Sequence, residues 1–327
     1  MRNTLARMIG LVAWVLAGAV HAAGTTGWPP ENAAVQIVIP SPGDTGINIA
    51  IARLVAEQLQ ARLGGHFAVE AYPPSHAASA AAYVAAAPAD GATLLLCDEA
   101  LLDIASQPWR DNLAPVTQLP PIGLVAELPN VLVANNDLPA DNLAEFTDYV
   151  QRNPGVVNFG SDGNGSAMHL AGQLYMTQTD SNMVHVAYSA SGQAMSNLIS
   201  GQIQSMFHLA PAVLSKIRSH QIKALAVMSD HRLPALEHVP TAAEQGYPQL
   251  RAGLWLALMA PPGTPRDVIE RTNKALNDAL LDSQVEQQLA DMGAIAAHGT
   301  PEEAASQIAA ERQRRRALMA ESDLPVR

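Results

Sequence analysis

The chain has 327 residues, of which 48% are hydrophobic but only 4% aromatic, so aliphatic side chains must form most of its cores. This length suits two domains of ordinary size. The 30 acidic residues outnumber the 19 basic ones and give a net charge of −11, which argues against a nucleic acid or an anionic membrane as the partner.

The first 23 residues have the pattern of a secretory signal peptide. Arg2 and Arg7 supply positive charge, residues 8–20 form an uncharged apolar run, and Ala23 is one of several small residues where cleavage is expected. The run is too short to span a bilayer comfortably, and an N-terminal anchor helix is the alternative. We therefore predict a periplasmic protein in which 17 basic residues stand against 30 acidic ones, a net charge of −13.

The part that follows alternates apolar runs with helical patterns. Cys97, the single cysteine, lies in an apolar run and is expected to be a buried thiol. Alternation of this kind is typical of a parallel α/β sheet. We predict strands over residues 35–39, 67–72 and 93–97, and helices over 47–63 and 77–87.

The same alternation returns in the second half of the chain. The apolar runs 122–125 and 130–134 lead toward it, and near Pro129 we expect the chain to leave the first domain. We predict strands over residues 156–159, 183–186, 203–207, 224–228 and 255–260, and helices over 143–150, from Ser166, over 193–199, 211–219, 266–281 and 283–292, and from Thr300.

Two β-α segments far apart in the sequence indicate two similar units. We predict an α/β fold with two lobes joined by a hinge, between which the chain crosses more than once. Residues 1–23 are assigned to the signal peptide, 24–129 with 252–327 to lobe 1, and 130–251 to lobe 2.

The most informative stretch is the turn Gly-Ser-Asp-Gly-Asn-Gly-Ser at residues 160–166. Its three glycines let the backbone turn sharply and come close to a guest molecule. Ser166 is a candidate N-cap of the helix that follows. The N–H groups at a helix start, with the positive end of the helix dipole behind them, form a site for an anion. A simple turn before a capped helix is the alternative.

A second loop, Pro-Ser-Pro-Gly-Asp-Thr-Gly at residues 40–46, has the same setting between a strand and a helix. Two strand–loop–helix units that face each other would hold a ligand between them. We therefore predict a cleft with one loop on each side.

Motifs of common enzyme chemistry are absent from the sequence. The loop at residues 160–166 has no lysine, which excludes a phosphate loop, and Met168 stands where a dinucleotide fingerprint needs glycine or alanine. No Gly-x-Ser-x-Gly motif occurs, and the ten histidines lack zinc-ligand spacing. We therefore predict no metal, no cofactor and no enzymatic activity.

Several short stretches follow one another as they do in one protein family. They are residues 52–59, Pro-Ala-Asp-Gly-Ala-Thr-Leu-Leu at 88–95, Phe-Gly-Ser-Asp-Gly-Asn-Gly-Ser at 159–166, His-Leu-Ala-Gly at 169–172, Val-His-Val-Ala-Tyr at 184–188, and residues 224–227, 239–246 and 260–265. Each motif is weak by itself, but together they are specific. Nearly all of the mature chain resembles the Bug family, also called TctC, the periplasmic solute-binding proteins of tripartite tricarboxylate transporters.

The resemblance implies a type II periplasmic-binding fold with a ligand cleft between its lobes. Members commonly hold small carboxylates through backbone amides and hydroxyls of two glycine-rich loops. The resemblance thus implies a monomer that captures a carboxylate or an amino acid and delivers it to the membrane subunits of a transporter. The expected ligand-binding residues are Pro42, Gly43, Asp44, Thr45, Gly46, Ser161, Asp162, Gly163, Asn164, Gly165, Ser166, His169, Tyr188 and His208.

The sequence departs from the family pattern at the expected site. The first loop has a different order of residues, Asp162 replaces a small residue, and His208 stands where the family has aspartate. Asp44 and Asp162 would repel a second carboxylate on the ligand, whereas a protonated His208 would offset one of them. We therefore expect a ligand less anionic than a dicarboxylate, such as an amino acid or an aromatic monocarboxylate. The alternative is that both acids point into solvent.

Two other functions fit the same pattern. One is a periplasmic sensor that presents its ligand-bound form to a membrane kinase. The other is a secreted α/β hydrolase in which Ser161 or Ser166 is the nucleophile and His169 the base, although the usual nucleophile motif is missing.

Overall fold

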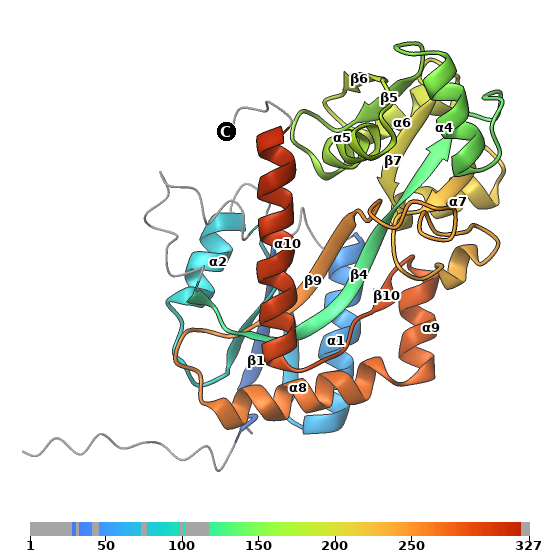
Figure 1. Ribbon diagram of the computed structural model, residues 1–327. Helices are drawn as coiled ribbons and strands as arrows, with labels where there is room; N and C mark the ends of the chain where they lie inside the picture. Colours follow the sequence, from blue (N-terminus) through green and yellow to red (C-terminus); the bar gives the residue numbers. More distant parts are fainter. Residues whose placement is uncertain are drawn as a thin grey trace, which may run out of the picture.

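The computed structural model describes residues 28–30, 33–40, 46–72, 77–98, 101 and 118–321. The expected signal peptide and the expected site residues Pro42, Gly43, Asp44 and Thr45 lie outside these ranges. Figure 1 shows two lobes connected by the long strand β4 (Pro121–Ala134) and by β9 (Gly253–Met259). The predicted α/β fold with two lobes is confirmed.

The first lobe begins with three parallel strands. They are β1 (Ala34–Pro40), β2 (His66–Tyr72) and β3 (Thr93–Asp98), in the order β2-β1-β3. The helix α1 (Ile47–Leu63) follows β1, and α2 (Ala77–Ala85) follows β2. The predicted bounds of α1 are confirmed, because Gly46 and Gly64 flank it with φ angles of 112° and 74°, which a helix does not contain.

Strand β4 connects the lobes without a break. Its first part pairs with β9, and its last part pairs with β7 (Ser205–Leu209) and β8 (Lys223–Val227). The apolar runs 122–125 and 130–134 are therefore one strand. Pro129 is tolerated because it lies where the pairing with β9 ends and the next N–H, that of Asn130, bonds to the Ala252 carbonyl.

The second lobe contains the predicted second β-α series. Its parallel strands are β5 (Asn158–Ser161), β6 (Val184–Ala187) and β7, in the order β7-β5-β6. Its helices are α4 (Leu143–Arg152), α5 (Ala167–Thr179), α6 (Ser191–Ile199), α7 (Ala210–Arg218) and the short 3₁₀ helix η3 (Pro234–Leu236).

The chain then returns to the first lobe through β9. It continues as α8 (Arg266–Leu280), α9 (Ser283–Asp291), β10 (Ile295–Ala296) and α10 (Pro301–Glu321). Thr300 and Glu303 form a reciprocal capping box at the start of α10, the helix predicted from Thr300. Helix α10 packs along β4 and reaches α5 of the other lobe (Figure 1).

The expected parallel pairing is confirmed within each β-α series but does not extend to the strands that connect the lobes. The pairs β3–β9, β9–β4, β4–β7 and β4–β8 are antiparallel, so the sheet is mixed. The reason is that β4 and β9 run in opposite directions: β9 returns between β3 and β4, and the end of β4 pairs with strands of the second lobe that run back toward the first.

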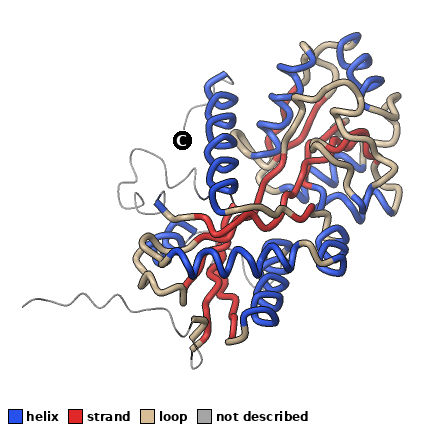
Figure 2. Tube along the Cα trace, turned by 60° about the horizontal axis from the view of Figure 1, so that its bottom comes forward, coloured by secondary structure: helices blue, strands red, loops and turns tan. Residues whose placement is uncertain are grey.

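Each lobe has a core on both faces of its strands, and Figure 2 shows helices outside the strands in each. In the first lobe, α1 and α8 cover one face, and α2 and α10 cover the other. In the second lobe, α4 and α5 face one core, and α6 and α7 face the other. Cys97 is buried as predicted, and burial raises the pKa of its thiol.

Candidate functional site

The strand directions place the carboxyl ends of both sheets against each other. Strand β4 runs from the first lobe to the second, and β1, β2 and β3 run in the same direction, so their last residues point toward the second lobe. Strands β5, β6 and β7 run against β4 and end toward the first lobe. In open α/β sheets ligands bind at such carboxyl ends. Both glycine-rich loops follow strands that end at this meeting point.

The loop after β5 has the geometry of a helix entrance. Gly163 and Gly165 have φ angles of 127° and 77°, which favour glycine. Ser166 caps α5, because its Oγ accepts a hydrogen bond from the His169 N–H at 3.2 Å. The predicted N-cap is thus confirmed.

Two of the loop N–H groups already donate hydrogen bonds to side chains of the protein. The Gly163 N–H donates to Ser161 Oγ at 3.1 Å, and the Gly165 N–H donates to His169 Nδ1 at 3.0 Å. Within the described part of the chain, the N–H groups of Asp162, Asn164, Ala167 and Met168 have no hydrogen-bond partner. The protein itself therefore leaves these four donors unused, in contrast to those of Gly163 and Gly165.

A pair of stacked histidines lies behind the loop. The rings of His169 on α5 and His185 on β6 are 3.8 Å apart between centroids, with an angle of 13° between their planes. His185 Nε2 lies 2.6 Å from Ser161 Oγ, and the ring of Phe159 packs 4.9 Å from that of His185. The pair was not predicted, because it depends on how α5 packs against β6, which has no local sequence signal.

Burial lowers the pKa of both imidazoles. Burial is the cause for His169, and burial followed by repulsion from His169 lowers the pKa of His185 to about 4. Both rings are therefore neutral at pH 7. A neutral His169 is also what its contact with Gly165 requires, since Nδ1 must accept the hydrogen bond.

Ser161 and His185 have the spacing of a nucleophile and a base, but Ser161 is 0% exposed. Its Oγ also donates to the Gly163 carbonyl at 3.0 Å and accepts from the Gly163 N–H. The geometry therefore assigns Ser161 to the support of the loop. The imidazole of His169, the base of the hydrolase alternative, bonds to the Gly165 N–H and to Gln173 and to neither serine hydroxyl, as a base would.

His208 and Asp162 approach each other at the edge of the second lobe. His208 lies near the end of β7 and is 9% exposed, and its Nδ1 is buried with no partner among the described residues. Burial lowers its pKa, whereas the charge of the exposed Asp162 acts in the opposite direction. His208 thus supplies a polar group without a positive charge at pH 7.

Tyr188 and Gly46 complete the expected residues that the structure describes. The Tyr188 N–H donates to the Ser161 carbonyl at 2.9 Å, and its hydroxyl accepts from Asn197 at 2.9 Å. Gly46 precedes α1 on the other lobe. The structure therefore groups Tyr188 with the loop after β5.

A separate cavity of about 660 Å³ lies beside the hinge. It is lined by β4, β9, α5 and α10, and no described residue of the loop after β5 lines it. Glu127 lies on its wall, and burial raises the pKa of that carboxyl although Arg251 opposes the shift. Arg314 of α10 donates to the Arg251 carbonyl at 2.6 Å and so joins α10 to the segment that leads into β9.

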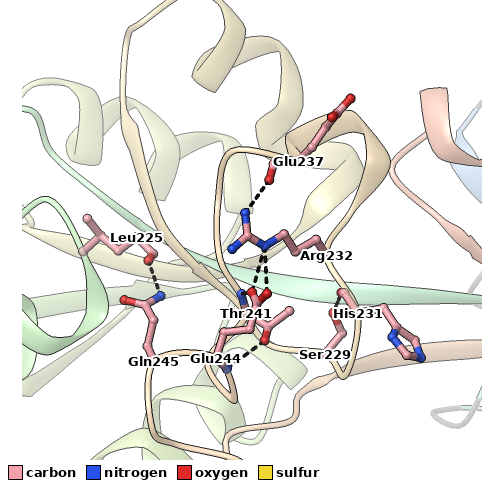
Figure 3. A network of polar contacts seen from close by, with 8 residues as sticks. All are labelled: Leu225, Ser229, His231, Arg232, Glu237, Thr241, Glu244 and Gln245. Atoms are coloured by element: carbon pink, nitrogen blue, oxygen red, sulfur yellow. Dashed lines mark hydrogen bonds and ion pairs between the residues drawn. The ribbon is translucent and has the colours of Figure 1, made fainter.

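The motif at residues 239–246 has a structural role (Figure 3). Thr241 and Glu244 form a capping box in which the Thr241 N–H donates to Glu244 at 2.7 Å and the Glu244 N–H donates to Thr241 at 3.1 Å. Arg232 also pairs with Glu244 at 2.8 Å, and Gln245 donates to the Leu225 carbonyl at 3.0 Å. These contacts fold the segment after β8 and account for its glutamate and glutamine.

The residues that the structure describes contain no group of three or more histidine, cysteine or acidic side chains placed to hold a metal ion. Among the same residues, no helix has the length and apolar character needed to cross a membrane.

Known proteins resemble the chain over most of its length. Residues 51–324 match the TctC family model, described as the tripartite tricarboxylate transporter family receptor. The chain is 31% identical over 318 residues to the protein BugT of Bordetella pertussis, covering 95% of each.

Two solved structures share the fold. One is an R. palustris protein with adipate, at a TM-score of 0.70 and 27% identity over 90% of this chain and 97% of that one. The other is MatC from Rhodopseudomonas palustris with bound malate, at a TM-score of 0.66 and 26% identity over 87% and 98%.

Proposed function

Because the chain belongs to the tripartite tricarboxylate transporter receptor family, known also as Bug or TctC, we propose that it captures a small carboxylate and delivers it to the membrane subunits of such a transporter. The family consists of periplasmic binding proteins for small ligands, and the chain has their fold. We propose that it acts as a monomer, with residues 24–129 and 252–327 in one lobe and 130–251 in the other.

The observation that carries the proposal is the group of unused N–H donors in the loop after β5. Those of Asp162 and Asn164 lie in the loop, and those of Ala167 and Met168 belong to the first turn of α5. A carboxylate accepts hydrogen bonds from such groups and interacts favourably with the positive end of the helix dipole. Gly46 and the other expected residues of the first loop would supply the opposite side of the site.

We propose that the ligand carries less negative charge than a dicarboxylate. The related structures hold adipate or malate. In this chain the exposed Asp162 adds a negative charge beside the donors, and the neutral His208 does not compensate for it. A second carboxylate would therefore be repelled, whereas an ammonium group on the ligand would be attracted to Asp162.

A thermal-shift screen tests this function. The ligand-stripped protein is heated with adipate, malate, benzoate, nicotinate or leucine, and a ligand at about a hundred times its Kd should stabilise it by about 2.7 kcal/mol. We expect benzoate, nicotinate or leucine to stabilise more than adipate or malate. Larger stabilisation by the dicarboxylates would contradict the charge argument, and no response to any of these compounds would contradict carboxylate binding.

Two glycine variants then locate the ligand. Gly163→Leu places a side chain on the binding loop, and Gly155→Leu places one on the turn after α4; both glycines have positive φ and open space around them. Both changes strain the backbone, but only Gly163→Leu should abolish the ligand-induced shift. Equal loss in both variants would contradict the proposed site.

A further inference from the structure

His169 and His185 connect the loop after β5 to the elements behind it through hydrogen bonds. His169 Nδ1 accepts the Gly165 N–H at 3.0 Å, and its Nε2 lies 3.2 Å from the Gln173 amide. His185 Nε2 contacts Ser161 Oγ at 2.6 Å, and that hydroxyl bonds to both the N–H and the carbonyl of Gly163. Each histidine thus reaches one of the two glycines that turn the loop.

The stack keeps these two contacts in place. The rings lie 3.8 Å apart and nearly parallel, and Phe159 packs against both. Phe159 is itself fully buried and packs edge-on against Phe207 of β7. A shift of one imidazole would therefore disturb the other, and with it both ends of the loop.

Among the residues that the structure describes, no acidic side chain raises the pKa of either histidine of the pair. The titratable groups on the neighbouring elements are His208 on β7, Asp162 in the loop, Tyr188 after β6 and Tyr175 further along α5. Among the described groups, only His169 affects the pKa of His185 electrostatically, and burial alone lowers the pKa of His169. Asp162 acts on His208 instead.

We propose that His169 and His185 are positioning residues for ligand binding: as neutral stacked imidazoles they hold residues 161–165 in the binding conformation, and protonation of the pair releases the loop. A proton on His169 Nδ1 removes the acceptor of the Gly165 N–H, and two stacked cations repel each other. The consequence for affinity rests on the proposed function, whereas the consequence for the loop rests on these contacts alone.

The direction of the pH effect follows from the lowered pKa values. The folded protein favours neutral rings, so the pair is intact above the ordinary histidine pKa of about 6.5 and becomes protonated as the pH falls toward 4. Ligand affinity should then fall by about tenfold per pH unit for each proton that the ligand-free protein takes up on the pair.

Nuclear magnetic resonance of the protein without ligand tests the loop directly. We expect the amide resonances of Gly163 and Gly165 to move together with the imidazole titration. The amide of Gly155, which donates to the Asn182 carbonyl at 3.0 Å, serves as the reference and should not move. Titration of His169 or His185 without movement of Gly163 and Gly165 would overturn the proposal.

An isosteric double variant separates positioning from mere stability. In His169→Asn with His185→Gln, an amide oxygen replaces Nδ1 and an amide group replaces Nε2, and neither side chain titrates. The two glycine amides should keep their pH 7 positions down to pH 4. Movement equal to that of the wild type would overturn the proposal.

The effect of pH on affinity is measured with the tightest binder among adipate, malate, benzoate, nicotinate and leucine. Acid also protonates these ligands, so the wild type is compared with the double variant and with His238→Gln, a change at an exposed histidine. Affinity should fall with acid in the wild type and in His238→Gln more steeply than in the double variant. Parallel curves would overturn the inference, whereas failure of every compound to bind would contradict the proposed function and leave the loop titration as the test of positioning.

Discussion

Single glycines in the second lobe show how closely the site is packed. A Cβ on Gly172 of α5 would lie 2.3 Å from the ring of Phe159, the same ring that packs against His169 and His185. A Cβ on Gly160 would lie 2.4 Å from Ile203. These glycines are required by contact with side chains and not by backbone conformation, which explains why periodicity did not single them out.

Gly172→Ala therefore should destabilise the protein although alanine is the better helix former. We expect a loss of about 1–3 kcal/mol from overpacking against Phe159. Gly192→Ala in α6 is the matched control, because nothing lies within 4 Å of its added Cβ. That change should stabilise by roughly 0.5–1 kcal/mol. Urea unfolding measures both, and a stable Gly172→Ala protein would contradict the close packing.

Element boundaries were predictable where the signal is local. The cap at Ser166, the bounds of α1 and the start of α10 after Thr300 depend on neighbouring residues, and all three are confirmed. The continuity of β4 and the antiparallel pairing of the hinge strands depend on partners that are distant in the sequence: β7 lies more than 70 residues from its partners in β4, and β9 more than 100. Local patterns contain no information about these pairings, so the sequence suggested a parallel sheet.

The caps of α5 and α4 separate stability from binding. Ser166 accepts the His169 N–H, and Asn142 accepts the Glu145 N–H at 2.9 Å in α4. Replacing either residue with alanine should cost about 1 kcal/mol of unfolding free energy. Calorimetric titration with the best carboxylate should show weaker binding for Ser166→Ala alone, because α5 begins at the binding loop. Equal affinities of the two variants would indicate that the α5 entrance does not hold the ligand.

At the scale of the whole molecule, two features lie where the lobes meet. One is the meeting of the carboxyl ends of the strands, where the loop after β5 lies, and the other is the cavity between α5, α10 and the hinge strands. The two glycine-rich motifs of the sequence pointed to the first, and a ligand cleft between the two loops stays a prediction. It gave no indication of the second, whose lining comes from β4, β9, α5 and α10 and has no common motif.

A titration of the ¹⁵N-labelled protein with benzoate, nicotinate or leucine, followed by amide resonances, tests the central claim most directly. If a carboxylate lies on the loop after β5, the amides of Asp162, Asn164, Ala167 and Met168 should shift most. Gly155 is distant in the fold and should stay in place, as should Gly253 in the hinge cavity. Largest shifts at Gly253 and its neighbours, with residues 162–168 unchanged, would contradict the account and place the ligand beside the hinge.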